Sequence, residues 1–145
     1  MSDQFKEVMI TGAVAIRIGG GGYGVLSVEE IITKSSNIGS AKIAVYKLGE
    51  EKLYDYCRAF GFGTRAGVTL GGEVNGILNP VRSWDKLTVT RIPMGQSIAV
   101  TPLQMVMAMC AIANEGKLMR PMLIKRLQEP TGEIATHPIN ASENK

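Results

Sequence analysis

The chain has 145 residues, of which 45% are hydrophobic and 20% are charged, and its formal net charge at pH 7 is +3. This length suits one domain with a real core, and the composition excludes a disordered chain. No run approaches the twenty apolar residues of a membrane span, and the basic residues do not alternate with aromatics in the way that nucleic-acid binding requires.

The first 24 residues carry a strand pattern followed by a glycine-rich loop. Residues 8–18 are apolar enough for a strand but too short to span a membrane, and they lack the order of a secretory signal. Residues 19–24 read GGGGYG and should not hold regular structure. They also match G-x-G-x-x-G, the dinucleotide-binding pattern, although four consecutive glycines match almost any such pattern. A nucleotide-binding loop therefore stays an alternative to a plain flexible loop.

Three helices are predicted one after another. Ser27 and Glu30 have capping-box spacing, which begins the first helix. The run Ser35-Ser36-Asn37 should interrupt or cap a helix, because these side chains bond to their own backbone. Gly49 and Gly61 are natural stops for the next two helices. The predicted helices cover residues 27–34, 37–48 and 50–60.

The second half of the chain combines an irregular stretch, one clear helix and a hairpin. Short strands are expected at 67–70 and 87–92. Thr101-Pro102, with Gln104 at the capping-box position, begins a helix that Gly116 should stop. Its apolar residues surround so much of the circumference that most of it should be buried. Strands over 118–127 and 133–136, joined by a Glu-Pro-Thr-Gly turn, should complete the pattern.

Few residues outside these patterns suggest chemistry. His137, the one histidine, has no nucleophile pattern around it and is expected on the surface. Cys57 and Cys110 are expected to be buried reduced thiols, and no residues have metal-ligand spacing. Trp84 is expected to anchor its loop on the core. We therefore expect no metal and no cofactor.

Three long stretches and their order carry a family resemblance. They read YGVLSVEEIITKSSNIGSAKIA, LYDYCRAFGFGTRAGVTLGGEVNGILNP and RIPMGQSIAVTPLQMVMAMCAIANEGKLMRPMLIKRL. From about Tyr23 to Leu127 the chain resembles the transpeptidase domain of class B penicillin-binding proteins, which cross-link peptidoglycan. This implies part of the α+β fold shared with serine beta-lactamases, mostly helical with a C-terminal β-hairpin. We divide the chain into a non-matching segment (1–24), a partial transpeptidase domain (25–137) and a disordered tail (138–145).

The resemblance gives Ser35 and Asn37 a catalytic role. Family members use S-x-x-K with the nucleophile, S-x-N, and K-[TS]-G. A hydroxyl and an amide that both donate and accept can pass a proton and hold a peptide carbonyl. The resemblance implies that Ser35 relays protons between the catalytic lysine and the leaving amine, while Asn37 orients that lysine and the substrate. From the residues alone, helix capping by this run is the plainer interpretation, and the two roles need not exclude each other.

The other two motifs have no credible counterpart in this chain. Residues 83–86 (SWDK) and 142–145 (SENK) fit S-x-x-K literally, but both follow S-x-N, whereas the family places its nucleophile before it. K-[TS]-G does not occur. We therefore expect the chain alone to be inactive, with exposed apolar helix surface that favours self-association. A non-catalytic, self-associating interaction protein is the second alternative.

For the parent protein the resemblance implies further properties. Its substrates would be peptidoglycan stem peptides, and beta-lactams would intercept the serine ester. It would be anchored in the membrane and act at the extracytoplasmic face of the bacterial cell membrane. This chain itself shows no targeting signal.

Overall fold

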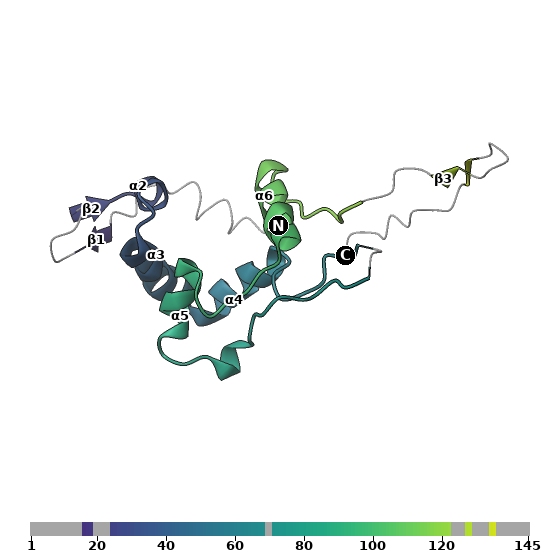
Figure 1. Ribbon diagram of the computed structural model, residues 1–145. Helices are drawn as coiled ribbons and strands as arrows, with labels where there is room; N and C mark the ends of the chain where they lie inside the picture. The colour runs from purple at the N-terminus through teal and green to yellow at the C-terminus, as the bar shows by residue number, and fades with distance from the viewer. Residues whose placement is uncertain (1–15, 19–23, 69–70, 123–126, 129–133, 136–145) are drawn as a thin grey trace.

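The structure is a computed structural model that describes residues 16–18, 24–68, 71–122, 127–128 and 134–135 (Figure 1). In chain order its elements are β1 (Ile16–Ile18), β2 (Gly24–Leu26), α2 (Val28–Thr33), α3 (Asn37–Ile43), the π-helical η1 (Ala44–Leu48), α4 (Gly49–Ala59), the 3-10 helix η2 (Val81–Ser83), α5 (Thr88–Arg91), the 3-10 helix η3 (Ile92–Met94), α6 (Pro102–Ala113), β3 (Leu127–Gln128) and β4 (Ile134–Ala135). Helices dominate this part of the chain, and the predicted mostly helical α+β character is confirmed.

Two short antiparallel strand pairs accompany the helices. β1 pairs with β2, with Ile16 opposite Leu26, and β3 pairs with β4, with Leu127 opposite Ala135. The predicted C-terminal hairpin is therefore present. Gly24, expected in the glycine-rich loop, instead begins β2. The rest of that loop, most of the first predicted strand, the hairpin turn, His137 and the tail lie outside the described residues.

Two other strand predictions are wrong where the structure describes them. Gly67 and Val68 form no strand, and neither do residues 118–122. Pro121 has no N–H to give to a strand ladder. The Arg120 guanidinium instead donates to the Gly67 carbonyl at 3.0 and 3.1 Å, which ties the two irregular segments together.

The capping signals act as predicted at two helices. At α2 the Glu30 N–H donates to Ser27 Oγ at 3.1 Å, and the Ser27 N–H donates to Glu30 Oε2 at 2.9 Å. At α6 the Gln104 N–H donates to Thr101 Oγ1 at 3.1 Å, and the Thr101 N–H donates to Gln104 Oε1 at 2.8 Å. Each pair satisfies N–H groups that a first helical turn leaves without an intrahelical acceptor.

A single glycine divides the second and third predicted helices. Gly49 has φ 75°, a left-handed value that suits glycine, and its N–H donates to the Ala44 carbonyl. Because that bond spans five residues, the turn before Gly49 is π-helical, where the pattern had predicted regular α-helix. α4 then ends at Ala59, and Gly61 follows it with φ 86°, as predicted.

One apolar cluster holds η1, α4, α5 and η3 together. Its buried members are Ala44, Leu53, Cys57, Val89 and Ile92. Trp84 packs against this cluster, meets the Tyr54 ring edge-on at a centroid distance of 6.2 Å, and donates its indole N–H to the Asn79 carbonyl at 2.8 Å. Trp84 is therefore the predicted loop anchor. A second, smaller cluster joins α2 to α3 and consists of Leu26, Ile31 and the partly buried Ile43.

The segment 87–92, predicted as a strand, is helical in the structure and forms α5 and the start of η3. The Asp85 carboxylate accepts the Leu87 N–H at 3.0 Å just before the helix begins. Val89 and Ile92, three residues apart and on one helical face, are both buried in the main cluster. The β preference of branched side chains is weak and depends on context, so burial against α4 and η1 decides the conformation.

α6 is less buried than its composition predicted. The exposed side chains on it include Met105, Val106, Met109, Cys110 and Ile112. Only the side that carries Gln104, Ala108 and Ala111 is buried by other described segments, so the prediction of a mostly buried helix is wrong here.

Cys57 is a buried free thiol as predicted, whereas Cys110 is free but exposed. Among the described helices, none has both the length and the apolar character to cross a membrane.

Candidate functional site

The run Ser35-Ser36-Asn37 forms the corner between α2 and α3. The Ser35 N–H donates to the Ile32 carbonyl at 3.0 Å, and the Ser36 N–H donates to the Ile31 carbonyl at 2.9 Å. These two bonds make a Schellman motif, whose left-handed residue is usually glycine. Here that residue is Ser35, with φ 48°. A left-handed backbone costs a residue with a Cβ about 1–2 kcal/mol, so the corner stores strain at this serine.

The middle residue of the run performs the capping. Ser36 Oγ accepts the Gly39 N–H at 3.2 Å and so begins α3. Neither Ser35 nor Asn37 provides this cap. The capping interpretation of the run is therefore correct for Ser36, and it leaves the two flanking side chains available for another role.

Ser35 and Asn37 are both exposed on the surface of this corner. Within the described part of the chain, no hydrogen bond is made by the Ser35 hydroxyl or by the Asn37 side-chain amide. Only Ser36 separates the two residues, so a hydroxyl and an amide, each able to donate and to accept, lie on one short stretch of backbone. Such a pair can hold a carbonyl or an amine and can pass a proton, provided that a reacting group is brought to it.

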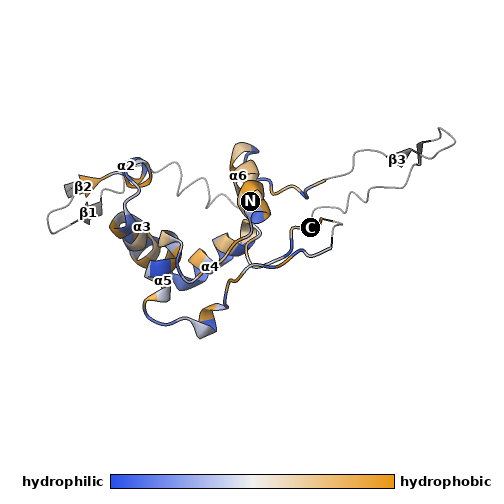
Figure 2. Cartoon of the chain, in the orientation of Figure 1, coloured by the Kyte–Doolittle hydropathy of each residue, from blue (hydrophilic) through white to orange (hydrophobic). Residues whose placement is uncertain are grey.

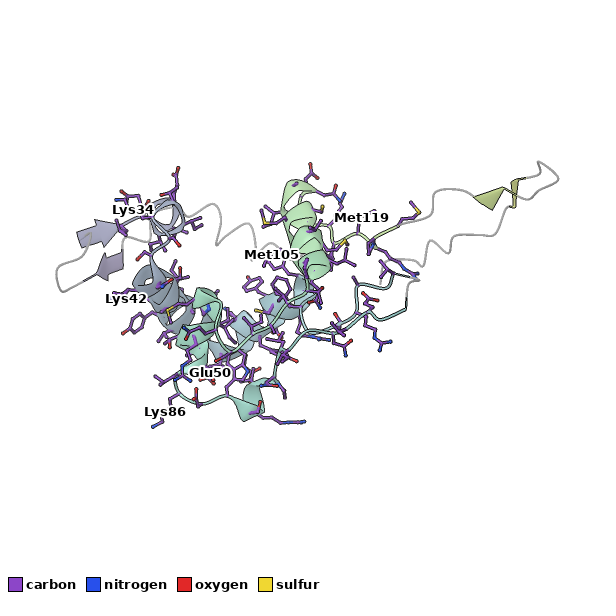
Figure 3. All side chains as sticks on the ribbon, viewed as in Figure 1. Lys34, Lys42, Glu50, Lys86, Met105 and Met119 are labelled. Atoms are coloured by element: carbon purple, nitrogen blue, oxygen red, sulfur yellow. The ribbon has the colours of Figure 1, made fainter. Side chains whose placement is uncertain are left out.

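A lysine adjoins the corner but is engaged elsewhere. Lys34 Nζ lies 3.5 Å from Glu30 Oε1, one helical turn earlier, and both side chains are partly exposed (Figure 3). The hydrogen bond from the Ser27 backbone, together with the nearby Lys34 charge, lowers the pKa of the Glu30 carboxyl. The Glu30 carboxylate thus pairs with Lys34 at the end of α2.

The described residues form cavities away from this corner. One, of about 230 Å³, lies between the end of α4 and α6 and includes Gln104; another, of about 420 Å³, lies beside η2 and α5 and includes Ser83 and Arg91. Neither includes Ser35 or Asn37. Ser35 and Asn37 are thus exposed side chains that line neither of these two cavities and are not buried between helices.

The literal S-x-x-K match at residues 83–86 lacks the geometry of a nucleophile and base. Ser83 is the last residue of η2, and its hydroxyl donates to the Pro80 carbonyl at 2.7 Å. Trp84 then adopts an extended conformation with ψ 141°, so Lys86 does not follow Ser83 on one helical turn. Figure 3 shows Lys86 extending outward from this loop.

Gln104 has a role beyond the capping that the sequence predicted. Its side chain is only 2% exposed, and its Nε2 donates to the Thr64 carbonyl at 2.6 Å and the Asn75 carbonyl at 2.8 Å. The same side chain therefore caps α6 and fixes two turns of the irregular segment. The capping-box spacing was the available signal, but it could not show which distant carbonyls the amide would reach.

In the described part of the chain, no three His, Cys, Asp or Glu side chains could share a metal ion.

Comparison with known proteins shows the family to which the chain belongs. Residues 13–145 match the family model described as the penicillin-binding protein transpeptidase domain. The chain is 38% identical over 108 residues to penicillin-binding protein PbpB of Mycobacterium tuberculosis, covering 74% of this chain and 16% of that protein. It is 36% identical over 110 residues to stage V sporulation protein D of Bacillus subtilis, covering 76% and 17%. The chain thus spans about a sixth of the length of these relatives.

Solved structures agree with the sequence comparison. The fold matches a crystal structure of penicillin-binding protein 3 from Mycobacterium tuberculosis complexed with aztreonam, with a TM-score of 0.74 and 35% identity over 83% of this chain and 28% of that one. A complex of the same protein with ampicillin also gives a TM-score of 0.74, over 86% and 29%. The predicted fold, part of a transpeptidase domain, is therefore confirmed.

Proposed function

Because the chain belongs to the penicillin-binding protein transpeptidase family, we propose that Ser35 and Asn37 form one wall of an acyl-transfer pocket that cross-links peptidoglycan stem peptides. The observation that supports this most directly is that the three side chains of the corner have different roles. Ser36 caps α3, while the flanking hydroxyl and amide are exposed and make no bond within the described residues.

The proposed reaction has two acyl-transfer steps. A serine hydroxyl on another part of the domain attacks the carbonyl of the penultimate D-alanine, and the terminal D-alanine leaves with a proton on its amine. The amine of a neighbouring peptide then attacks the serine ester, and the serine regains its proton. Ser35 passes the proton between the catalytic lysine and the amine, and Asn37 holds that lysine and the substrate carbonyl. A beta-lactam would occupy the same pocket as an acylating analogue.

Location and activity follow from the same proposal. The parent domain would act at the extracytoplasmic face of the bacterial membrane, where peptidoglycan is built. The isolated chain would not react with penicillin, because S-x-N supplies neither a nucleophile nor its activating lysine. A band labelled by fluorescent penicillin on the isolated chain, and lost in Ser83→Ala, would overturn this and make Ser83 the nucleophile.

A chimeric domain tests the wall itself. Residues 24–122 would replace the matched segment of the penicillin-binding protein 3 transpeptidase domain from Mycobacterium tuberculosis, whose structures hold aztreonam or ampicillin. We expect covalent labelling by fluorescent penicillin, and a rate reduced about 100- to 10,000-fold by Ser35→Ala or Asn37→Ala, the range that a positioned proton-transfer group contributes.

The matched control is Ser36→Ala, which removes the helix cap but neither of the proposed wall groups. It should lower stability by about 1 kcal/mol while leaving the labelling rate of the folded chimera nearly unchanged. Circular dichroism and thermal unfolding would establish that each chimera is folded. Equal labelling rates for the parent chimera and its Ser35→Ala and Asn37→Ala variants would refute the proposed wall.

A further inference from the structure

Ile31, in α2, contacts the Ser35-Ser36-Asn37 corner in two ways. Its carbonyl accepts the Ser36 N–H at 2.9 Å. Its side chain packs against Gly39 in the first turn of α3, and its three carbons beyond Cβ all lie within 3.0 Å of the position that a Cβ atom on residue 39 would take. Ordinary carbon–carbon contacts are about 3.5–4.0 Å long, so the absence of a side chain at Gly39 allows this approach. Ile31 therefore holds the corner through both its main chain and its side chain.

The Ile31 side chain is itself fixed in place. It is 1% exposed and packs with Leu26 of β2, which is also 1% exposed, and with the partly buried Ile43 of α3. Figure 2 shows the hydrophobic colouring of β2 and of part of α2. Because a packed interior has few voids, a change in the volume of one buried side chain displaces its neighbours. A change at Ile31 should therefore reach the backbone of the corner.

The two proposed wall groups have no support from side-chain bonds of their own. Ser35 and Asn37 are exposed, and within the described residues neither the Ser35 hydroxyl nor the Asn37 amide makes a hydrogen bond. The Ser35 backbone is left-handed, with φ 48°, and such a conformation persists only where surrounding contacts hold it. The direction of both side chains thus depends on the backbone between α2 and α3, which Ile31 contacts from its buried side.

We propose that Ile31 is a positioning residue for the acyl-transfer wall of Ser35 and Asn37. This proposal rests on the proposed function of that wall. Ile31 touches no reacting atom, and it acts by setting the separation between the end of α2 and the start of α3. A displacement of about 1 Å by a mutation away from the chemistry can slow a reaction about 100-fold. Shortening the Ile31 side chain should therefore slow acylation even though Ser35 and Asn37 are unchanged.

The test uses the chimeric transpeptidase domain and compares Ile31→Ala with Leu53→Ala. Both changes remove the same number of carbon atoms from a buried side chain, and Leu53 lies in α4, in the main apolar cluster. Two quantities are measured with fluorescent penicillin: the fraction of molecules labelled and the rate constant of labelling. Lower stability reduces the fraction in both variants. We expect only Ile31→Ala to reduce the rate constant, by about 10- to 100-fold.

Two further variants keep the test decisive. Ile31→Val removes only the Cδ1 atom and should fold even if Ile31→Ala does not, with a smaller reduction in the rate constant. Gly39→Ala should also slow labelling, because its Cβ collides with the Ile31 side chain. Adding Ile31→Ala to Gly39→Ala removes all three colliding carbons, so the double variant should label faster than Gly39→Ala alone.

The full 145-residue chain provides a measurement that does not depend on the chimera. Hydrogen exchange of the Ser36 amide, which bonds to the Ile31 carbonyl, should be faster in Ile31→Ala than in Leu53→Ala. The amides of α4 should show the opposite order. Equal exchange at Ser36 in the two variants would contradict the proposed hold of Ile31 on the corner.

The labelling results separate this proposal from the proposed function. Parent-like rate constants in Ile31→Ala and Ile31→Val, together with slow labelling in Ser35→Ala, would remove the positioning role and leave the wall intact. Equal slowing by Leu53→Ala would likewise overturn it, because lost packing anywhere would then have the same effect. Parent-like labelling in both Ser35→Ala and Asn37→Ala would refute the wall itself, and the role of Ile31 with it.

Discussion

The Ile31 side chain packs directly against Gly39, so closely that a Cβ atom on residue 39 would lie 2.7 Å from Ile31 Cγ1 and 2.8 Å from Ile31 Cγ2. The Gly39 N–H also donates to Ser36 Oγ, which is the hydrogen bond that caps α3. This contact brings α3 against α2 at the corner that carries Ser35 and Asn37. Gly39, two residues after Asn37, therefore fixes the geometry of the candidate site.

Gly39→Ala should destabilise the chain. Alanine gains up to about 1 kcal/mol over glycine inside a helix, but overpacking a buried contact costs about 1–3 kcal/mol, so the clash with Ile31 outweighs the gain. Urea unfolding measures the net loss. Gly71→Ala is the control, because a Cβ there meets nothing within 4 Å. If Gly39→Ala proved as stable as Gly71→Ala, the close packing of α2 on α3 would be incorrect.

Ser35→Gly should leave the chain equally stable or stabilise it by up to about 1 kcal/mol. Glycine removes the left-handed strain at φ 48°, and it partly offsets that gain by adding freedom to the unfolded chain. Ser40→Gly, inside α3, should have the opposite sign and cost about 0.5 kcal/mol. Thermal unfolding compares the two. In the chimera, Ser35→Gly should still slow penicillin labelling. A variant that keeps its stability but labels slowly would show that the loss comes from the missing hydroxyl and not from unfolding of the corner.

Gln104→Ala should be strongly destabilising. The change leaves the Thr64 and Asn75 carbonyls without their donor and removes the second bond of the α6 capping box. We expect a loss of at least about 2 kcal/mol, since each buried polar group left unpaired costs about 1–3 kcal/mol. Gln96→Ala, at an exposed position, should change stability little. A small effect of Gln104→Ala in denaturant unfolding would show that water replaces the amide at both carbonyls.

Stability should fall at alkaline pH because of Cys57. Burial raises the pKa of its thiol from 9.0 to about 11, so the folded state keeps a proton that the unfolded state releases. The stabilisation is complete below pH 9 and is lost as the pH rises toward 11, at up to about 1.4 kcal/mol per pH unit. Cys57→Ala should flatten this decline, whereas Cys110→Ser, at an exposed thiol, should preserve it. Unfolding free energies measured from pH 8 to pH 11 would show the difference between the two slopes.

The sequence alone was sufficient where the determining contacts lie within a few residues. Ser27 with Glu30 and Thr101 with Gln104 each close a capping box across one helical turn, so spacing predicts both helix starts. Gly49 and Gly61 end helices because only glycine adopts left-handed backbone without strain. The family resemblance carried by the three long stretches was likewise visible in the residues, and it is confirmed, whereas the catalytic role of Ser35 and Asn37 stays a prediction.

Tertiary structure decided the features that depend on distant partners. The segment 87–92 has a strand-like composition, yet it is helical because that places Val89 and Ile92 against α4 and η1. The assignment of the cap to Ser36, rather than to its neighbours, required the backbone path between α2 and α3. The exposure of α6 and the carbonyls reached by Gln104 depend on which segments pack nearby. Local hydrogen bonds can be inferred from spacing, whereas burial is a property of the whole packed chain.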